Sequence, residues 1–216
     1  MASIPSYDTV ITEAPFLPSV YTMALLAQAD HILFEQYENY TKGTYRNKGV
    51  VRSNQNNQYL IVPLVKGKHR SQPIKMVQIA YDEDWFRIMK NRLQTEYGSF
   101  PYYPHYIEDI HAIVGRKYRY LFDLNMRLIQ YFFELLEITN YSLTESYVPQ
   151  YSEDLLDLRS KITPLFFKNH PGLLKRIELE YFSFIPGHTF LEVLFSYGPE
   201  SRRLVDEYGA RIHWSG

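Results

Sequence analysis

The chain of 216 residues contains no cysteine. Disulfide bonds, thiolate metal ligands and cysteine nucleophiles are therefore excluded, and any covalent mechanism is left to oxygen or nitrogen nucleophiles. No stretch reaches the roughly 18 apolar residues that a membrane-spanning helix needs, so we expect no membrane insertion. The first ten residues, MASIPSYDTV, lack the basic and apolar regions of a secretory signal, and we expect a cytoplasmic location.

Acidic residues are absent from Asn39 to Tyr81. The chain as a whole is nearly neutral, with 23 basic and 24 acidic residues, so this block is locally positive. Coulomb attraction would draw a phosphate or carboxylate to it, although solvated strand faces are the alternative explanation. We expect no nucleic-acid partner, because the isoelectric point is about 6.7 and no reading module is recognisable. The basic residues of the block are Lys42, Arg46, Lys48, Arg52, Lys66, Lys68, Arg70 and Lys75.

The common motifs of nucleotide binding and hydrolysis are also missing. The chain contains no GxxxxGK[ST], GxGxxG, GxSxG or HExxH pattern. The seven histidines do not have the spacing of metal ligands, since His105 and His111 are six residues apart and the others are isolated. We therefore expect no metal site and no cofactor.

Aromatic residues are abundant, with 20 tyrosines and 13 phenylalanines. Tyrosine tolerates partial exposure, because its ring packs while its hydroxyl group forms hydrogen bonds. This composition suits sugar stacking or a partner interface, and it equally suits an ordinary tyrosine-rich core and surface.

The first 36 residues predict an α/β fold. TVIT (9–12) has the pattern of a short strand, and Ser19 is placed to cap a helix that ends near Asp30. HILFEQ (31–36) then has the pattern of a buried strand. This order predicts a single α/β domain over residues 1–216, with a mixed β-sheet and flanking helices. In such folds, binding sites collect at the carboxyl ends of the strands.

The remaining pattern predicts a hairpin, a further strand and several helices. The hairpin is formed by 48–53 and 58–65 around the amide-rich turn NQNN, and the strand covers 73–81. Asp82 is expected to cap a helix whose core stripe contains Phe86, Met89, Leu93 and Tyr97. Further helices are expected at 104–114, 118–138, 155–162 and 189–198, with an amphipathic turn or two over 199–212 and an irregular excursion over 148–170.

The segment Glu35–Val51, EQYENYTKGTYRNKGVV, is the candidate site. It follows a buried strand and combines acids, amides, phenols and bases. Glu35 or Glu38 is a candidate general base if burial raises its pKa. Arg46 and Lys42 suit a phosphate or carboxylate, although Arg46 could instead bridge two loops. The predicted ligand-binding residues are Asn39, Tyr40, Lys42, Tyr45, Arg46 and Asn47, together with Tyr102 from the aromatic loop 97–106 that is expected to meet this site.

The order of residues resembles that of the WbqC-like family. APFLPSVYTMALLAQADHILFE and ENYTKGTYRNK resemble its N-terminal part, YDEDWFRIMKNRLQTEYGSFPYY and YRYLFDLNMRLIQ its helical centre, and FIPGHTFLEVLFSYGPES its closing signature. The resemblance covers roughly residues 9–204. Trp85, Tyr97, Pro101, Asp123 and Asn125 stand at the expected places, whereas Val50, Glu192 and Ser196 depart from the pattern.

The resemblance implies a role in O-antigen or other surface polysaccharide biosynthesis. It implies a transferase that moves an acyl or aminoacyl group, such as a glycyl group, to a nucleotide-linked or lipid-linked sugar. The expected ligand is a small-molecule sugar or a phosphate-bearing compound, and the oligomeric state is left open. The alternative is a non-catalytic glycan-binding or partner-binding protein of the same pathway. An enzyme should bury Glu35 or Glu38 beside an arginine or tyrosine in a pocket.

Overall fold

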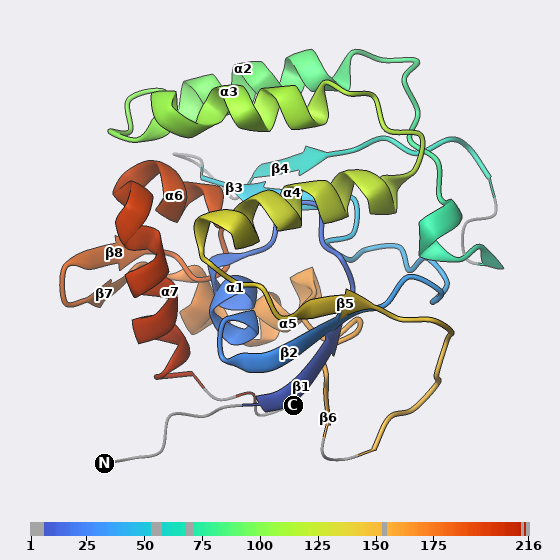
Figure 1. Cartoon of the computed structure of the whole chain (residues 1–216). Coiled ribbons are helices and arrows are strands. Elements are labelled where there is room, and N and C mark those ends of the chain that lie inside the picture. Colours follow the sequence, from blue (N-terminus) through green and yellow to red (C-terminus); the bar gives the residue numbers. More distant parts are fainter. Residues whose placement is uncertain (1–6, 53–57, 68–70, 153–154, 213, 215–216) are drawn as a thin grey trace.

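The computed structural model describes residues 7–52, 58–67, 71–152, 155–212 and 214. Its main sheet contains four parallel strands in the order β5-β2-β1-β6. Figure 1 shows this sheet at one side of the molecule, with helices stacked over it. The four strands are β1 (Tyr7–Thr12), β2 (Ala29–Phe34), β5 (Tyr141–Leu143) and β6 (Leu155–Asp157).

The first strand-helix-strand unit agrees with the sequence prediction. Helix α1 (Val20–Leu26) begins at Ser19, whose side chain accepts a hydrogen bond from the backbone N–H of Thr22. The helix ends at Leu26, before the predicted Asp30, because β2 already begins at Ala29. Every residue of α1 is buried, and the helix packs against α7 (Ser201–Gly209).

Two small antiparallel sheets complete the strands. β3 (Lys48–Val51) pairs with β4 (Gln58–Ile61), which confirms the predicted hairpin, while the NQNN turn lies outside the described residues. β7 (Ile177–Leu179) pairs with β8 (Phe182–Phe184). The predicted α/β class is confirmed, with the parallel and antiparallel pairs placed in separate sheets.

Helices α2 (Trp85–Tyr97) and α3 (Tyr103–Val114) form an outer layer, and α4 (Leu121–Leu135) lies between that layer and the sheet (Figure 1). α4 lies within the predicted helix 118–138, and its apolar residues Leu121, Leu124, Leu128 and Phe132, which recur at helical spacing, are buried. The C-terminal helices are short: α5 (Pro164–Asn169), α6 (Leu191–Tyr197), α7 and the 3₁₀ turns η3 (Pro171–Leu174) and η4 (Gly198–Glu200). No described helix has the length and apolar character that crossing a membrane requires.

Three sequence predictions were wrong. Residues 73–81 form no strand; they contain the 3₁₀ turn η2 (Ile74–Met76), because Pro73 offers no N–H and the next two N–H groups bond to the loop after β2. The helix α2 is capped by Asp84, not Asp82, since the Asp84 carboxylate accepts from the Arg87 N–H. Residues 155–162 begin as strand β6 and not as a helix, because they pair with β1.

Candidate functional site

The carboxyl ends of the four parallel strands converge on one cluster of polar side chains. The strand order reverses at β1, which has β2 on one side and β6, the last of this sheet's four strands along the chain, on the other. Ligand crevices in open α/β sheets form at such reversal points, outside the carboxyl ends. The residues that follow the strands are Glu13 after β1, Glu35 after β2, Thr144 after β5, and Arg159 and Ser160 after β6.

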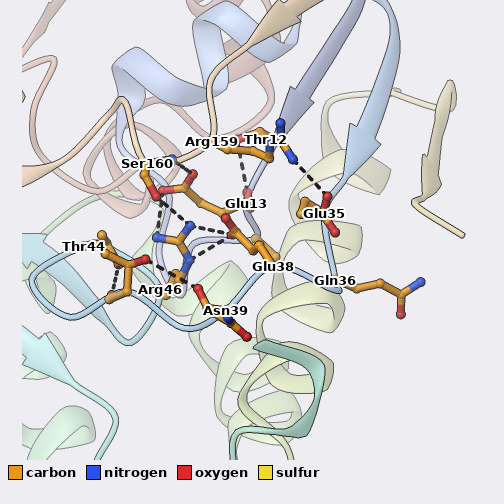
Figure 2. Close-up of polar contacts among 12 residues, drawn as sticks. Thr12, Glu13, Glu35, Gln36, Glu38, Asn39, Thr44, Arg46, Arg159 and Ser160 are labelled. Carbon is orange, nitrogen blue, oxygen red and sulfur yellow. Dashed lines mark hydrogen bonds and ion pairs between the residues drawn. The ribbon is translucent and has the colours of Figure 1, made fainter. Parts of the chain in front are cut away.

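Arg46 is the centre of the cluster, and its side chain is completely buried. Its Nε and Nη2 atoms donate to Oε1 of Glu38 at 3.1 and 2.5 Å, and Nη2 also donates to the Ser160 hydroxyl at 3.0 Å. Nη1 lies 3.6 Å from Oε1 of Glu13, whose other oxygen accepts from the Ser160 N–H at 2.6 Å. Figure 2 shows the guanidinium enclosed by these groups. Arg46 therefore ties the loops after β1, β2 and β6 together.

Asn125 of α4 holds the backbone beneath this arginine. Its Nδ2 group donates to the carbonyl oxygens of Ala14 at 2.8 Å and Arg46 at 2.7 Å, and the side chain is completely buried. The family resemblance had singled out Asn125 without giving it a role. A buried amide on an apolar helix face was the available signal, because such a group must find hydrogen-bond partners.

A second arginine, Arg159, was missed by the sequence prediction. Its Nε contacts both carboxylate oxygens of Asp157 at 3.0 and 3.1 Å, and its Nη1 donates to Glu35 at 3.2 Å and to the Val148 carbonyl at 2.8 Å. Its guanidinium lies 5.0 Å from the ring centre of Tyr151. The sequence analysis predicted a helix over residues 155–162, so Asp157 and Arg159 were not recognised as residues at the end of a strand.

Glu35 is satisfied within the protein. It is completely buried and accepts from the Tyr37 N–H at 2.7 Å and the Thr144 hydroxyl at 3.0 Å, in addition to its contact with Arg159. A carboxylate held by this many donors is suited to fixing loops in place.

Glu38 instead borders a cleft of about 360 Å³. The side of the cleft opposite Glu38 is formed by the loops around β6, and the residue as a whole is 8% exposed. Both described hydrogen bonds of its carboxylate end on Oε1, which leaves Oε2 for a ligand. The cleft is lined by Tyr37, Glu38, Asn39, Thr41, Tyr147, Asp157, Arg159 and Ser160.

Burial raises the pKa of the Glu38 carboxyl to about 7, and the neighbouring carboxylates of Glu13 and Glu35 add to the rise. Arg46 acts in the opposite direction but does not cancel the cost of burial. Burial alone would lower the pKa of Arg46, yet Glu13 and Glu38 together raise it. The raised pKa values of Arg46 and Glu38 are consistent with each other. The Arg46 guanidinium is stabilised by two carboxylates, whereas Glu38 has only one guanidinium, which it shares with Glu13.

The cluster is negative overall, although the segment Asn39–Tyr81 is free of acids. Two guanidiniums face four carboxylates, so one proton or one cationic ligand reduces the excess charge. This charge excess adds to burial, the larger cause, in raising the pKa of Glu38. The members are Glu13, Glu35, Glu38 and Asp157 on one side and Arg46 and Arg159 on the other.

The other predicted site residues are distributed around this cluster. Asn39 is exposed and lines the cleft, and Lys42 is exposed one residue beyond Thr41 of its lining. The Tyr40 hydroxyl donates to Asn47, whose amide donates to the Val62 carbonyl, so both stabilise the start of the β3–β4 hairpin.

Two further predicted residues lie away from the polar cleft. Tyr45 is buried, with its ring 5.9 Å from that of Phe167 in α5. Tyr102 packs at the start of α3 against Gly198, and its N–H donates to Phe195 of α6. The described contacts of Tyr102 therefore connect it to the C-terminal helices.

Comparison with known proteins identifies the chain at the family level. The model of the WbqC-like protein family matches residues 14–170, from the loop after β1 to the end of α5. This range contains every member of the charged cluster except Glu13, the residue just before it. Neither the curated proteins nor the solved structures that were searched gave a match. Because the family model covers well over half of the sequence, the chain belongs to the WbqC-like protein family.

Proposed function

We propose that the protein is a transferase that moves an acyl or aminoacyl group to a nucleotide-linked or lipid-linked sugar in surface polysaccharide biosynthesis. The observation that carries this proposal is Glu38: it is nearly buried, held by Arg46, and borders a cleft with its pKa raised to about 7. A general base is most effective when its pKa lies near the working pH. The sugar pathway is what the resemblance to the WbqC-like family implies.

In the proposed reaction, Glu38 acts on the nucleophile. A sugar hydroxyl or amine attacks the carbonyl carbon of the donor, and Glu38 takes the proton that the nucleophile loses. The bond between the carbonyl carbon and the leaving group then breaks, and the protonated Glu38 returns the proton to the leaving group. Arg46 does not face the cleft; it is a positioning residue that fixes Oε1 of Glu38 and directs Oε2 toward the substrate.

The remaining walls of the cleft suit a sugar. Tyr147 is 51% exposed and offers a ring for stacking, and the Asn39 amide and the Thr41 hydroxyl can donate to or accept from sugar hydroxyl groups. Lys42 is exposed at the rim, where its ammonium group could reach a phosphate attached to the sugar.

The geometry favours catalysis over the alternative of a non-catalytic binding protein. A glycan-binding surface would be expected to present a flat or grooved aromatic face with ordinary acids. Here a perturbed carboxyl lies in a concave polar cleft at the carboxyl ends of parallel strands, which is the arrangement typical of an active site.

The experiment incubates the purified protein with pairs of acyl or aminoacyl donors and nucleotide-linked or lipid-linked sugars, and detects products by mass spectrometry. Glu38→Gln should lower turnover about 10²- to 10⁴-fold while substrate-induced thermal stabilisation persists. Glu108→Gln, on the exposed face of α3, is the matched control and should retain full activity. The rate with the wild-type protein should rise with pH through about 7, because the base must be ionised.

Equal turnover by the wild-type protein and Glu38→Gln would refute the role of Glu38. Stabilisation by a sugar ligand without any product, across all donor pairs, would refute the transferase and favour the binding protein.

A further inference from the structure

A second hollow of about 580 Å³ is lined in part by chain segments that directly follow those of the polar cleft. The loop that carries Asn39 and Thr41 into the polar cleft continues to Gly43 and Tyr45, which line the second hollow. On the other side, Arg159 and Ser160 line the polar cleft, and residues of α5, which begins at Pro164, line the second hollow. We call this second hollow the α5 cleft. Its lining is mainly apolar and includes Tyr45, Val50, Tyr59, Leu165, Phe167 and Leu174.

One face of the β3–β4 hairpin extends the apolar surface beyond the cleft. Val50 pairs across the hairpin with Tyr59, and Lys48 pairs with Ile61, so all four side chains lie on one face. Tyr59 and Ile61 are 44% and 56% exposed, and Leu165 on α5 is 62% exposed. Large apolar side chains that gather at the surface around a hollow indicate a site for an apolar ligand.

The charges that border the α5 cleft are positive. Lys168 is the charged residue among those that line it, and no carboxylate is included in that described lining. Lys48 lies over the Tyr59 ring, with its Nζ 4.9 Å from the ring centre. An apolar floor with cations at its edge complements a hydrocarbon chain that bears an anionic group. The aliphatic part of the lining, Val50, Leu165 and Leu174, offers no group to pair with the polar edge of a nucleotide base, whereas the aromatic rings can pack against a hydrocarbon chain.

We propose that the α5 cleft binds the hydrocarbon chain of a lipid-linked phosphate substrate, with the phosphate beside Lys168 and the sugar directed along the shared loop toward Glu38. The placement of the sugar rests on the proposed function. The inference deepens that function by selecting a lipid-linked substrate over a nucleotide-linked one.

The test uses octyl, decyl and dodecyl monophosphate below their micellar concentrations, with binding measured by titration calorimetry on the full chain. One fully buried methylene group strengthens binding about fourfold, so the affinity should rise by up to about fifteenfold with each added pair of methylenes. Leu165→Asp should weaken dodecyl phosphate binding at least tenfold and flatten the dependence on chain length. Lys168→Glu should weaken the binding of all three ligands by a similar factor.

Ile88→Asp is the matched control, because Ile88 is 56% exposed, close to the 62% of Leu165, but lies on α2, outside the residues that line the α5 cleft. It should bind all three ligands as the wild-type protein does. The inference is overturned if affinity does not depend on chain length, or if Leu165→Asp behaves like Ile88→Asp.

Failure of the inference can be told apart from failure of the proposed function. Glu38→Gln should bind dodecyl phosphate normally, whether or not the wild-type protein catalyses a transfer. An absence of transfer together with a steep chain-length series would refute only the reaction. A flat series together with transfer to nucleotide-linked sugars would refute only the lipid site.

Discussion

Replacing Glu38 with glutamine should change how the stability of the protein depends on pH. Burial raises the pKa of Glu38 from 4.5 to about 7, so between these values the folded protein retains a proton that the unfolded chain has released. Ionisation of this group is therefore more costly in the folded state. As the pH rises from about 4.5 to above 7, the free energy of unfolding falls by about 3 kcal/mol from this group, at about 1.4 kcal/mol for each tenfold change in proton affinity.

Glutamine has nearly the same shape, can still accept a hydrogen bond from Arg46 at Oε1, and does not ionise. The stability of Glu38→Gln relative to the wild-type protein should therefore increase by up to about 3 kcal/mol between pH 5 and pH 8. The measurement is urea denaturation of both proteins across this range, with the linear extrapolation that two-state unfolding permits. Glu108→Gln serves as the control for loss of an exposed carboxylate.

A difference between the wild-type protein and Glu38→Gln that stays constant from pH 5 to pH 8 would show that Glu38 has an ordinary pKa. It would also remove the main argument for a general base at this position. If Glu38→Gln instead became less stable relative to the wild-type protein as the pH rises, the interaction with Arg46 would outweigh burial and lower the pKa of Glu38. That outcome would contradict the raised pKa on which the proposed base depends.

Two further substitutions test the cluster. Arg46→Met keeps an unbranched apolar stem but leaves Glu13 and Glu38 without a guanidinium, so urea denaturation at pH 8 should show a loss of about 3–5 kcal/mol, with a smaller loss at pH 5. A loss below about 1 kcal/mol at pH 8 would contradict the pairing. Ser160 has a φ angle of +54°, a conformation that glycine adopts more easily than residues with a Cβ atom. Ser160→Gly should therefore be about 1 kcal/mol more stable than Ser160→Ala, since both variants lack the hydroxyl group and only alanine retains Cβ. Equal stabilities would mean that the backbone at Ser160 is not strained.

The parts of the fold that the sequence predicted well are those controlled by local periodicity. Ser19 caps α1 because its hydroxyl and the next turn are close in sequence, and the stripe from Leu121 to Phe132 on α4 repeats at helical spacing. β1 and β2 are apolar runs separated by a short helix, so their type could be recognised without knowledge of their partners.

The prediction failed where long-range pairing decides the structure. Residues 155–157 form a strand because they bond to β1, more than 140 residues earlier, and their own short apolar run is equally compatible with a helix. The same error concealed half of the site. Asp157 and Arg159 acquire their place at the cleft only when β6 is recognised as a parallel strand whose carboxyl end lies beside that of β1.

The charge of the site illustrates the same limit in a different way. The acid-free segment 39–81 suggested a positive pocket for an anion, yet its residue at the centre of the cluster, Arg46, is surrounded by carboxylates from other elements. A count along the chain averages over neighbours in sequence, whereas the pKa of a buried group responds to neighbours in space. Because acids outnumber guanidiniums there, the arginine that seemed suited to hold a ligand instead holds Glu38, and the carboxyl left at the edge of the cleft is the group able to exchange a proton near neutral pH.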